Sequence, residues 1–264
     1  MRKLIAIKTC RVKRAWADAQ RQTWVRDVVG KGYADVRFFM GAWDARIKSA
    51  ACGDEVFLDV PDDYAGIPLK VRAICDWAVE HNYDQVSLCD DDVYVVPERY
   101  KTLPTEPFNY VGRFRPPYGT VYPPHFASGF FYTLSNRAAA FVAGIPWNGD
   151  WMDERFVATA LAHWGIIGYH DPRNYMVTGP HMDAPAILSA DIFRKGTAFC
   201  EYEPRAMYAL HLAMRHLTPV AAHPGLIRQP QVVVTDEILA SKPNDEIPPH
   251  KRNRVYVSDG YRSH

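Results

Sequence analysis

The stretch that decides the fold is Gln85-Val86-Ser87-Leu88-Cys89-Asp90-Asp91-Asp92. Its first five residues have the apolar character of a buried strand, and three consecutive aspartates follow them. Open α/β sheets bind their ligands at the carboxyl ends of the strands. The acidic triplet is therefore predicted to lie at a ligand-binding edge of a sheet.

Strand-like and helix-like segments alternate around this stretch, which predicts an α/β fold with a mixed, mostly parallel central sheet flanked by helices. One large domain is expected over residues 1–220, and the proline-rich, charged residues 221–264 are expected to form a C-terminal arm or tail packed on it. The predicted strands cover residues 3–9, 34–40, 55–59, 85–89 and 130–134, and the predicted helices cover 15–28, 69–80 and 153–163, with another beginning at 136.

Composition excludes several classes of protein. The 264 residues include 31 Lys and Arg against 30 Asp and Glu, so no global field attracts the chain to nucleic acid or to an acidic membrane. The five cysteines lack the paired spacing of a zinc or redox site. The apolar run at residues 4–7 is too short for a signal peptide, and no later segment reaches the length of a membrane span. A cytoplasmic protein without a membrane span is expected.

The triplet Asp90-Asp91-Asp92 concentrates negative charge that mutual repulsion disfavours unless a cation is present. Mg²⁺ and Mn²⁺ prefer carboxylate oxygens and keep positions for the phosphate oxygens of a substrate. Acidic runs are more often solvated turns or helix caps. Here, however, the apolar residues 93–96 follow, so the acids interrupt a buried pattern. The sequence predicts a Mn²⁺ or Mg²⁺ site, with Asp90 and Asp92 as direct ligands.

A second acidic pair, Asp153-Glu154, stands at the start of a predicted helix. Either acid is explained by capping and by the favourable position of negative charge at a helix N-terminus. The alternative is catalytic, because a carboxylate at such a site can accept the proton of a hydroxyl group. The pattern alone leaves both explanations open.

An ordered series of motifs resembles the β-1,3-glycosyltransferases, a family that includes β-1,3-galactosyltransferases, N-acetylglucosaminyltransferases and Fringe. The series spans about residues 4–170. It comprises Arg21-Gln22-Thr23-Trp24, Asp62-Asp63-Tyr64 with Leu69-Lys70, Asp90-Asp91-Asp92-Val93-Tyr94, the segment from Tyr122 to Gly129 with Tyr132-Thr133-Leu134-Ser135, and Asp153-Glu154-Arg155-Phe156-Val157.

The resemblance implies a GT-A fold and a metal-dependent, inverting transfer of sugar from a UDP-sugar to a hydroxyl acceptor. In the family the second acid of the last motif is the catalytic base, which corresponds to Glu154 here. Glu154 replaces the usual Asp, and Ala158 replaces a characteristic Gly. Because the longer side chain displaces the carboxylate, Asp153 is the alternative base.

The family also implies a histidine as a third metal ligand. His211, which looks like the end of a buried strand, is preferred over His181, which stands in a Gly-Pro loop. A lone histidine is more commonly a hydrogen-bonded structural residue. The predicted nucleotide-sugar contacts are Thr9, Arg14, Arg21, Lys70, Asp90, Asp91, Ser128 and Gly129. Arg21 and Lys70 can equally pair with local acids.

Two other functions fit parts of the pattern. Clustered carboxylates also serve nucleotidyltransferases and phosphodiesterases. The departures at Glu154 and Ala158 fit a sugar- or nucleic-acid-binding module with a degraded site. The acceptor stays open between a glycan, a small molecule, a protein and a hydroxymethylated base in phage DNA. Only the basic residues 11–14 and 251–254 point to DNA, and a solvated surface explains them as well.

Overall fold

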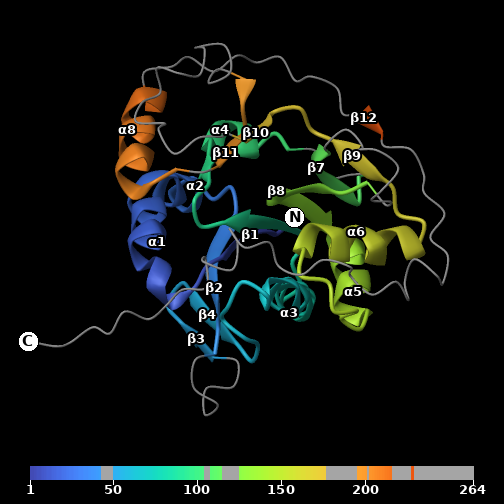
Figure 1. Ribbon diagram of the computed structural model, residues 1–264. Coiled ribbons are helices and arrows are strands. Elements are labelled where there is room, and N and C mark those ends of the chain that lie inside the picture. Colours follow the sequence, from blue (N-terminus) through green and yellow to red (C-terminus); the bar gives the residue numbers. More distant parts are fainter. Residues whose placement is uncertain are drawn as a thin grey trace, which may run out of the picture.

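The structure is a computed structural model that describes residues 1–42, 50–103, 108–114, 125–176, 195–200, 202–215 and 227–228. Within these residues a nine-stranded sheet runs through the middle of the molecule in the order β12-β9-β7-β8-β5-β1-β2-β4-β3 (Figure 1). Its strands are β1 (Lys3–Lys8), β2 (Asp35–Gly41), β3 (Ala50–Cys52), β4 (Glu55–Leu58), β5 (Gln85–Asp90), β7 (Tyr110–Phe114), β8 (Ala127–Ser135), β9 (Gly168–His170) and β12 (Ile227–Arg228).

The neighbouring strands β5, β1, β2 and β4 pair in parallel, and β8 runs antiparallel between β5 and β7. This confirms the predicted mixed α/β sheet. The parallel pairing of β1 with β5 sets Lys8 opposite Asp90 at the last position of both strands. The carboxyl ends of the two central strands therefore meet at the acidic triplet, as the sequence predicts.

Helices cover both faces of the sheet (Figure 1). The alternation along β1 shows why, because Ile5 and Ile7 enter one apolar cluster while Leu4 and Ala6 enter the other. The first cluster includes residues of α1 (Arg14–Gln20), α2 (Arg26–Gly30) and α8 (Pro204–Arg215), and the second includes residues of α3 (Ile67–Glu80), α5 (Asn136–Gly144) and α6 (Asp153–His163). No helix in the described residues is both long and apolar enough to cross a membrane.

The predicted helix over residues 15–28 has an interruption. After the 3₁₀ turn η1 (Arg11–Lys13) and α1, the π-helical segment η2 (Arg21–Val25) leads into α2, and Thr23 has non-helical angles of φ −112° and ψ −113°. The Thr23 hydroxyl donates hydrogen bonds to the Ala19 carbonyl at 2.6 Å and the Gln20 carbonyl at 3.3 Å. A side chain that bonds back onto its own helix in this way promotes a bend.

A small second sheet was not predicted from the sequence. It has the order β10-β11-β6, with β6 (Tyr94–Val95), β10 (Asn174–Met176) and β11 (Ala198–Cys200), and the short helix α4 (Pro97–Tyr100) follows β6. After β11 the chain enters α8, which contains His211. The expectation that His211 ends a strand is therefore wrong, because Pro204 opens an amphipathic helix whose Met207 and Leu210 pack into the first cluster.

The predicted C-terminal arm is described only at Ile227 and Arg228. These two residues form β12, which pairs antiparallel with β9 at the edge of the main sheet. The other residues of the predicted arm lie outside the described part of the chain.

Candidate active site

The three aspartates at the end of β5 differ in burial. Asp91 is buried and accepts a hydrogen bond of 3.0 Å from the Thr9 hydroxyl, which follows β1. Burial is the main reason why the pKa of Asp91 is raised to about 6. Asp90 and Asp92 are partly exposed on either side of it. The second carboxylate therefore holds the ends of β1 and β5 together, whereas the first and third are only partly buried.

Lys8 is a buried lysine that the sequence analysis did not identify. Its Nζ lies 2.8 Å from Asp90 Oδ1 and 2.8 Å from Asp153 Oδ2, and it donates a 2.9 Å hydrogen bond to the Gly129 carbonyl. Burial alone lowers the pKa of a lysine, but the charges of Asp153 and Asp90 outweigh it and raise the pKa of Lys8 above its usual value. A permanent positive charge thus joins the acidic triplet to the second acidic pair.

The second acidic pair lies in the first turn of α6. Met152 occupies the N-cap position and makes no side-chain capping bond. Asp153 instead contacts Lys8 and accepts a hydrogen bond of 3.3 Å from the Tyr132 hydroxyl. Capping alone therefore does not explain Asp153, although both acids keep the favourable position at a helix N-terminus.

Glu154 is a partly buried carboxyl group next to Asp153. Burial, followed by the negative charge of Asp153 and a hydrogen bond with it, raises the pKa of Glu154 to about 8. A carboxyl group of this kind holds its proton at neutral pH and is a stronger base than an ordinary glutamate once the proton is lost.

Strand β8 packs close to the two acids at Gly129. A Cβ atom on Gly129 would lie 3.0 Å from Glu154 Oε2 and 3.3 Å from Asp153 Oδ1, so only glycine leaves this space open. Ser128, its neighbour in the strand, is buried. Of these two predicted contacts, Gly129 thus lies by the acidic pair, where its carbonyl accepts the Lys8 hydrogen bond.

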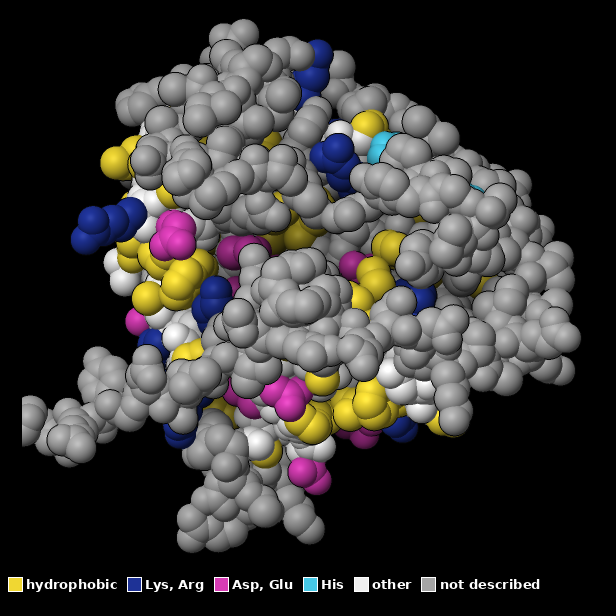
Figure 2. All heavy atoms as spheres, viewed as in Figure 1, with side chains coloured by type: hydrophobic (Ala, Val, Ile, Leu, Met, Phe, Trp, Pro, Cys, Tyr) yellow, Lys and Arg dark blue, Asp and Glu magenta, His cyan; other side chains and the backbone are white. Residues whose placement is uncertain are grey.

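Two aromatic residues stand near the acids. The Tyr64 and Trp151 rings lie 6.2 Å apart. The pKa of Tyr64 is raised, first by burial and then by the negative charge of Glu154. Trp151 precedes α6 by two residues. These rings form an apolar surface beside the carboxyl groups, and in Figure 2 acidic and apolar side chains occupy a recessed region near the middle of the face shown.

A separate pocket with a volume of about 230 Å³ lies beyond the end of β1. Thr9, Arg14 and Arg21, three of the predicted nucleotide-sugar contacts, line it together with Phe38, Met40 and Glu55. Lys70, also predicted as a contact, does not line this pocket. Its buried Nζ donates 2.7 Å hydrogen bonds to the Thr9 carbonyl and to Asp62 Oδ1, which fixes the chain after β1.

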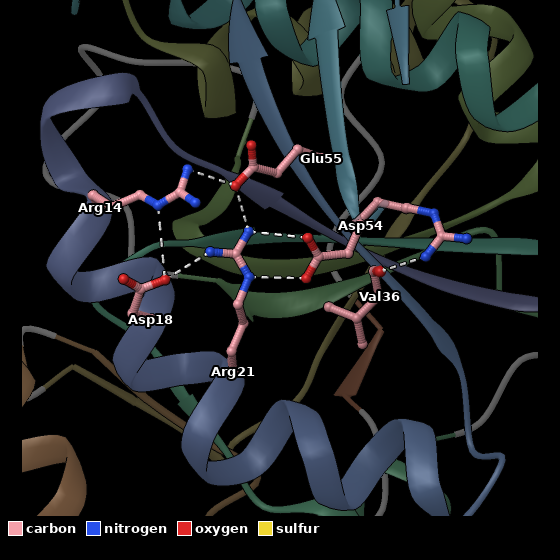
Figure 3. Close-up of polar contacts among 7 residues, drawn as sticks. Arg14, Asp18, Arg21, Val36, Asp54 and Glu55 are labelled. Carbon is pink, nitrogen blue, oxygen red and sulfur yellow. Dashed lines mark hydrogen bonds and ion pairs between the residues drawn. The ribbon is translucent and has the colours of Figure 1, made fainter. Parts of the chain in front are cut away.

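Arg21 is held by carboxylates on three sides (Figure 3). Its guanidinium bonds both oxygens of Asp54, at 2.8 and 3.0 Å, Asp18 at 2.9 Å, and Glu55 at 2.7 Å. It also lies 4.1 Å from the centre of the Phe38 ring. Most of its hydrogen-bonding capacity is thus used within the protein, which makes Arg21 a link between α1 and β4.

The residues around the triplet meet the chemical needs of a hard cation only in part. Within the described residues, no group of three or more His, Cys, Asp or Glu side chains is placed to hold one metal ion. Asp90 and Asp92 offer two partly exposed carboxylates, which is the number that Mg²⁺ commonly takes from a protein when substrate phosphates supply the rest.

His211 lies among other partners. Its Nδ1 and the Tyr94 hydroxyl share a 2.9 Å hydrogen bond, and its Nε2 is 3.9 Å from Asp27 Oδ2. The structure thus does not bring His211 together with Asp90 and Asp92 in a set of three ligands. The alternative ligand His181 lies outside the described residues.

Sequence reasoning did not identify Lys8 and Glu55 as site residues. It named Tyr64 as part of a motif but did not predict that Tyr64 lies beside the two acids. Lys8 stands at the end of an apolar run, where a lysine is unusual unless it is paired, and this was the available signal. Glu55 begins a strand and carries no comparable signal.

Comparison with known proteins gives a limited result. No protein-family model matches the chain, and no curated protein matches its sequence. Among solved structures, one similar to it is the crystal structure of a glycosyltransferase involved in the glycosylation of the major capsid of PBCV-1. The identity is 13%, the match covers 81% of this chain and 100% of that chain, and the TM-score is 0.47. Likeness at this level assigns no activity, which has to be inferred from the chain's own residues.

Proposed function

We propose that this protein is a metal-dependent glycosyltransferase that transfers a sugar from a UDP-sugar to a hydroxyl acceptor with inversion at the anomeric carbon. The observation that carries this proposal is the bridge made by Lys8. It places the partly exposed Asp90 next to the acidic pair Asp153 and Glu154, at the carboxyl ends of adjacent strands. Groups suited to a diphosphate leaving group and to an attacking hydroxyl thus share one site.

Asp90 and Asp92 are the residues that would hold Mn²⁺ or Mg²⁺. When bound, such an ion supplies Lewis-acid stabilisation of the negative charge that develops on the departing diphosphate. The contact with Lys8 fixes the orientation of the Asp90 carboxylate. The contact of Asp91 with Thr9 keeps the turn after β5 in place.

Glu154 is the proposed base. The acceptor oxygen forms its bond to the anomeric carbon while the bond to the diphosphate oxygen breaks, and the hydroxyl proton passes to Glu154. A pKa near 8 lies close to the working pH, which is the range in which a general base is most effective. Lys8 and Tyr132 hold Asp153, and Asp153 in turn orients Glu154.

The identity of the released nucleotide tests this function. The purified chain is incubated with UDP-sugars and Mn²⁺, with and without a panel of hydroxyl acceptors. Sugar transfer releases UDP, whereas a nucleotidyltransferase or phosphodiesterase releases UMP. NMR of the product gives the anomeric configuration.

The proposal requires acceptor-dependent UDP release that EDTA abolishes and Asp92→Asn strongly reduces. Release of UMP would replace it with the phosphodiesterase class. Binding of a UDP-sugar without any turnover, in the presence of every acceptor, would favour a binding module.

A further inference from the structure

The pocket beyond β1 has a polar corner formed by Glu55 and Arg14. Glu55 Oε1 accepts two hydrogen bonds, from Arg14 Nη1 at 2.9 Å and from Arg21 Nη2 at 2.7 Å. Both bonds use the same oxygen. Within the described part of the chain, no hydrogen bond or ion pair engages Oε2, and in Figure 3 this oxygen points away from Arg21.

The carboxylate of Glu55 is held in place before any ligand arrives. Arg21 is fixed by its two bonds to Asp54 and by the Phe38 ring beneath it, so its bond to Glu55 has little freedom. The Glu55 side chain is only 16% exposed, whereas Arg14 is 65% exposed at the rim. A preorganised acceptor recognises a ligand at a small entropic cost.

The remaining walls of the pocket suit a flat, apolar ring. Phe38, Met40 and Phe57 line it, and its volume of about 230 Å³ lies below the range of about 300–1,000 Å³ found for complete small-molecule sites. The space therefore fits one heterocyclic part of a donor better than a whole nucleotide-sugar. Its place next to Thr9, at the end of β1, puts it beside the acidic triplet through the Thr9–Asp91 bond.

An oxygen acceptor next to a guanidinium donor is complementary to a ring N–H flanked by a carbonyl group. Uracil and thymine present this arrangement at N3–H and O4, and guanine presents it at N1–H and O6. Cytosine and adenine instead have an unprotonated ring nitrogen at the corresponding position. Its lone pair would face the lone pairs of Glu55 Oε2, which leaves a polar group unpaired.

We propose that Glu55 and Arg14 are the residues that select the nucleobase of the donor, with Glu55 Oε2 accepting the ring N–H and Arg14 donating to the adjacent carbonyl. This inference rests on the proposed function and names a specificity device within it. The recognised chemistry is an N–H/C=O edge, which uracil, thymine and guanine share.

Dissociation constants of nucleoside diphosphates test the inference directly. UDP, dTDP, GDP, CDP and ADP are titrated into the full chain with Mn²⁺ by calorimetry. At least one of the first three is expected to bind roughly tenfold or more tightly than CDP and ADP, as expected for a two-point contact to a base edge. The order among UDP, dTDP and GDP then tells whether a pyrimidine or a purine fits.

Glu55→Gln is the decisive variant. An amide can turn either its oxygen or its NH₂ group towards the base, so the preference over CDP is expected to fall to about threefold or less. Glu98→Gln is the matched control, because Glu98 pairs with Lys31 at an exposed position and does not line the pocket. It is expected to retain the preference.

Arg14→Gln tests the proposed donor to the base carbonyl. It replaces Glu55→Gln as the test if that variant fails to fold. It is expected to weaken binding of the preferred base about tenfold, whereas Arg26→Gln, at an exposed position of α2, leaves binding unchanged. An unaltered preference in Glu55→Gln, or wild-type binding without any preference among the five nucleotides, would overturn this inference while leaving the proposed function standing. Absence of binding by every nucleoside diphosphate would overturn both.

Discussion

Lys8 Nζ and Asp153 Oδ2 lie 2.8 Å apart although 145 residues separate them in the chain. This ion pair joins the end of the first strand to the first turn of α6, and the same ammonium group contacts Asp90. The two acidic motifs are therefore parts of one electrostatic unit, and removal of Lys8 affects both.

Lys8→Met is expected to lower the free energy of unfolding by about 3–5 kcal/mol, because it leaves the enclosed Asp153 without its counter-charge. Urea denaturation measures this change. Lys31→Met is the matched control, since the pair between Lys31 and Glu98 is exposed and contributes about 0–1 kcal/mol. Adding Asp153→Asn to Lys8→Met is expected to recover part of the loss. Equal effects of the two lysine variants would contradict a structural role for the buried pair.

The activity is expected to depend on the ionisation of Glu154. Because the base must be unprotonated, kcat/KM is expected to rise about tenfold per pH unit below about 8 and to level off above it. Glu154→Gln is expected to lose about 100-fold or more of the activity. A profile that is flat between pH 6 and 9 would argue against Glu154 as the base and in favour of Asp153.

The Glu154 carboxyl group is expected to make the free energy of unfolding fall with rising pH, whereas kcat/KM rises. The pKa of Glu154 is raised in the folded state, so between pH 4.5 and about 8 the folded state holds a proton that the unfolded state has lost. This contribution is fully present below pH 4.5 and disappears as the pH rises through 8. Urea denaturation at pH 6 and 9 is expected to show a smaller pH effect in Glu154→Gln than in the wild type.

Gly129→Ala is expected to reduce activity at least tenfold, because the new Cβ would lie within 3.0 Å of Glu154 Oε2 and displace the acid. Gly144→Ala in α5 is the control, since no atom lies within 4 Å of its added Cβ. That change is expected to keep full activity and to stabilise the fold by about 0.4–1 kcal/mol. The kcat values and melting temperatures of the two variants are compared. Full activity of Gly129→Ala would show that the packing of Gly129 does not orient Glu154.

The members of the acidic triplet are expected to differ in their response to metal. Asp92→Asn is expected to lower kcat on the order of 100-fold and to abolish the thermal stabilisation that Mn²⁺ and UDP give together. Asp91→Asn is expected to change kcat less than tenfold, because the amide oxygen can still accept the Thr9 hydrogen bond. Removal of metal by EDTA is expected to reproduce the Asp92→Asn result in the wild type. Equal losses of kcat at both positions would contradict the assignment of Asp91 to a structural role and of Asp92 to metal binding.

Most elements of the main sheet are predictable from the sequence because they depend on local patterns. The apolar run before Asp90 becomes β5, and the predicted helix at 153–163 begins and ends at the expected residues. The short strands β6 and β11 were not predicted, since two or three residues give no measurable alternation. The sequence around His211 predicts a strand where the structure has helix α8, because a short apolar run fits either period.

The sequence by itself determined the α/β class, the position of the acidic triplet at a strand end and the position of the second acidic pair at a helix start. Only the tertiary structure decided that Lys8 joins these acids, that Asp91 turns towards Thr9, and that Arg21 holds Glu55 at the edge of a pocket. The physical reason is the range of the interactions. Apolar periodicity and turn residues act over a few positions, whereas ion pairs and burial depend on which distant strands become neighbours.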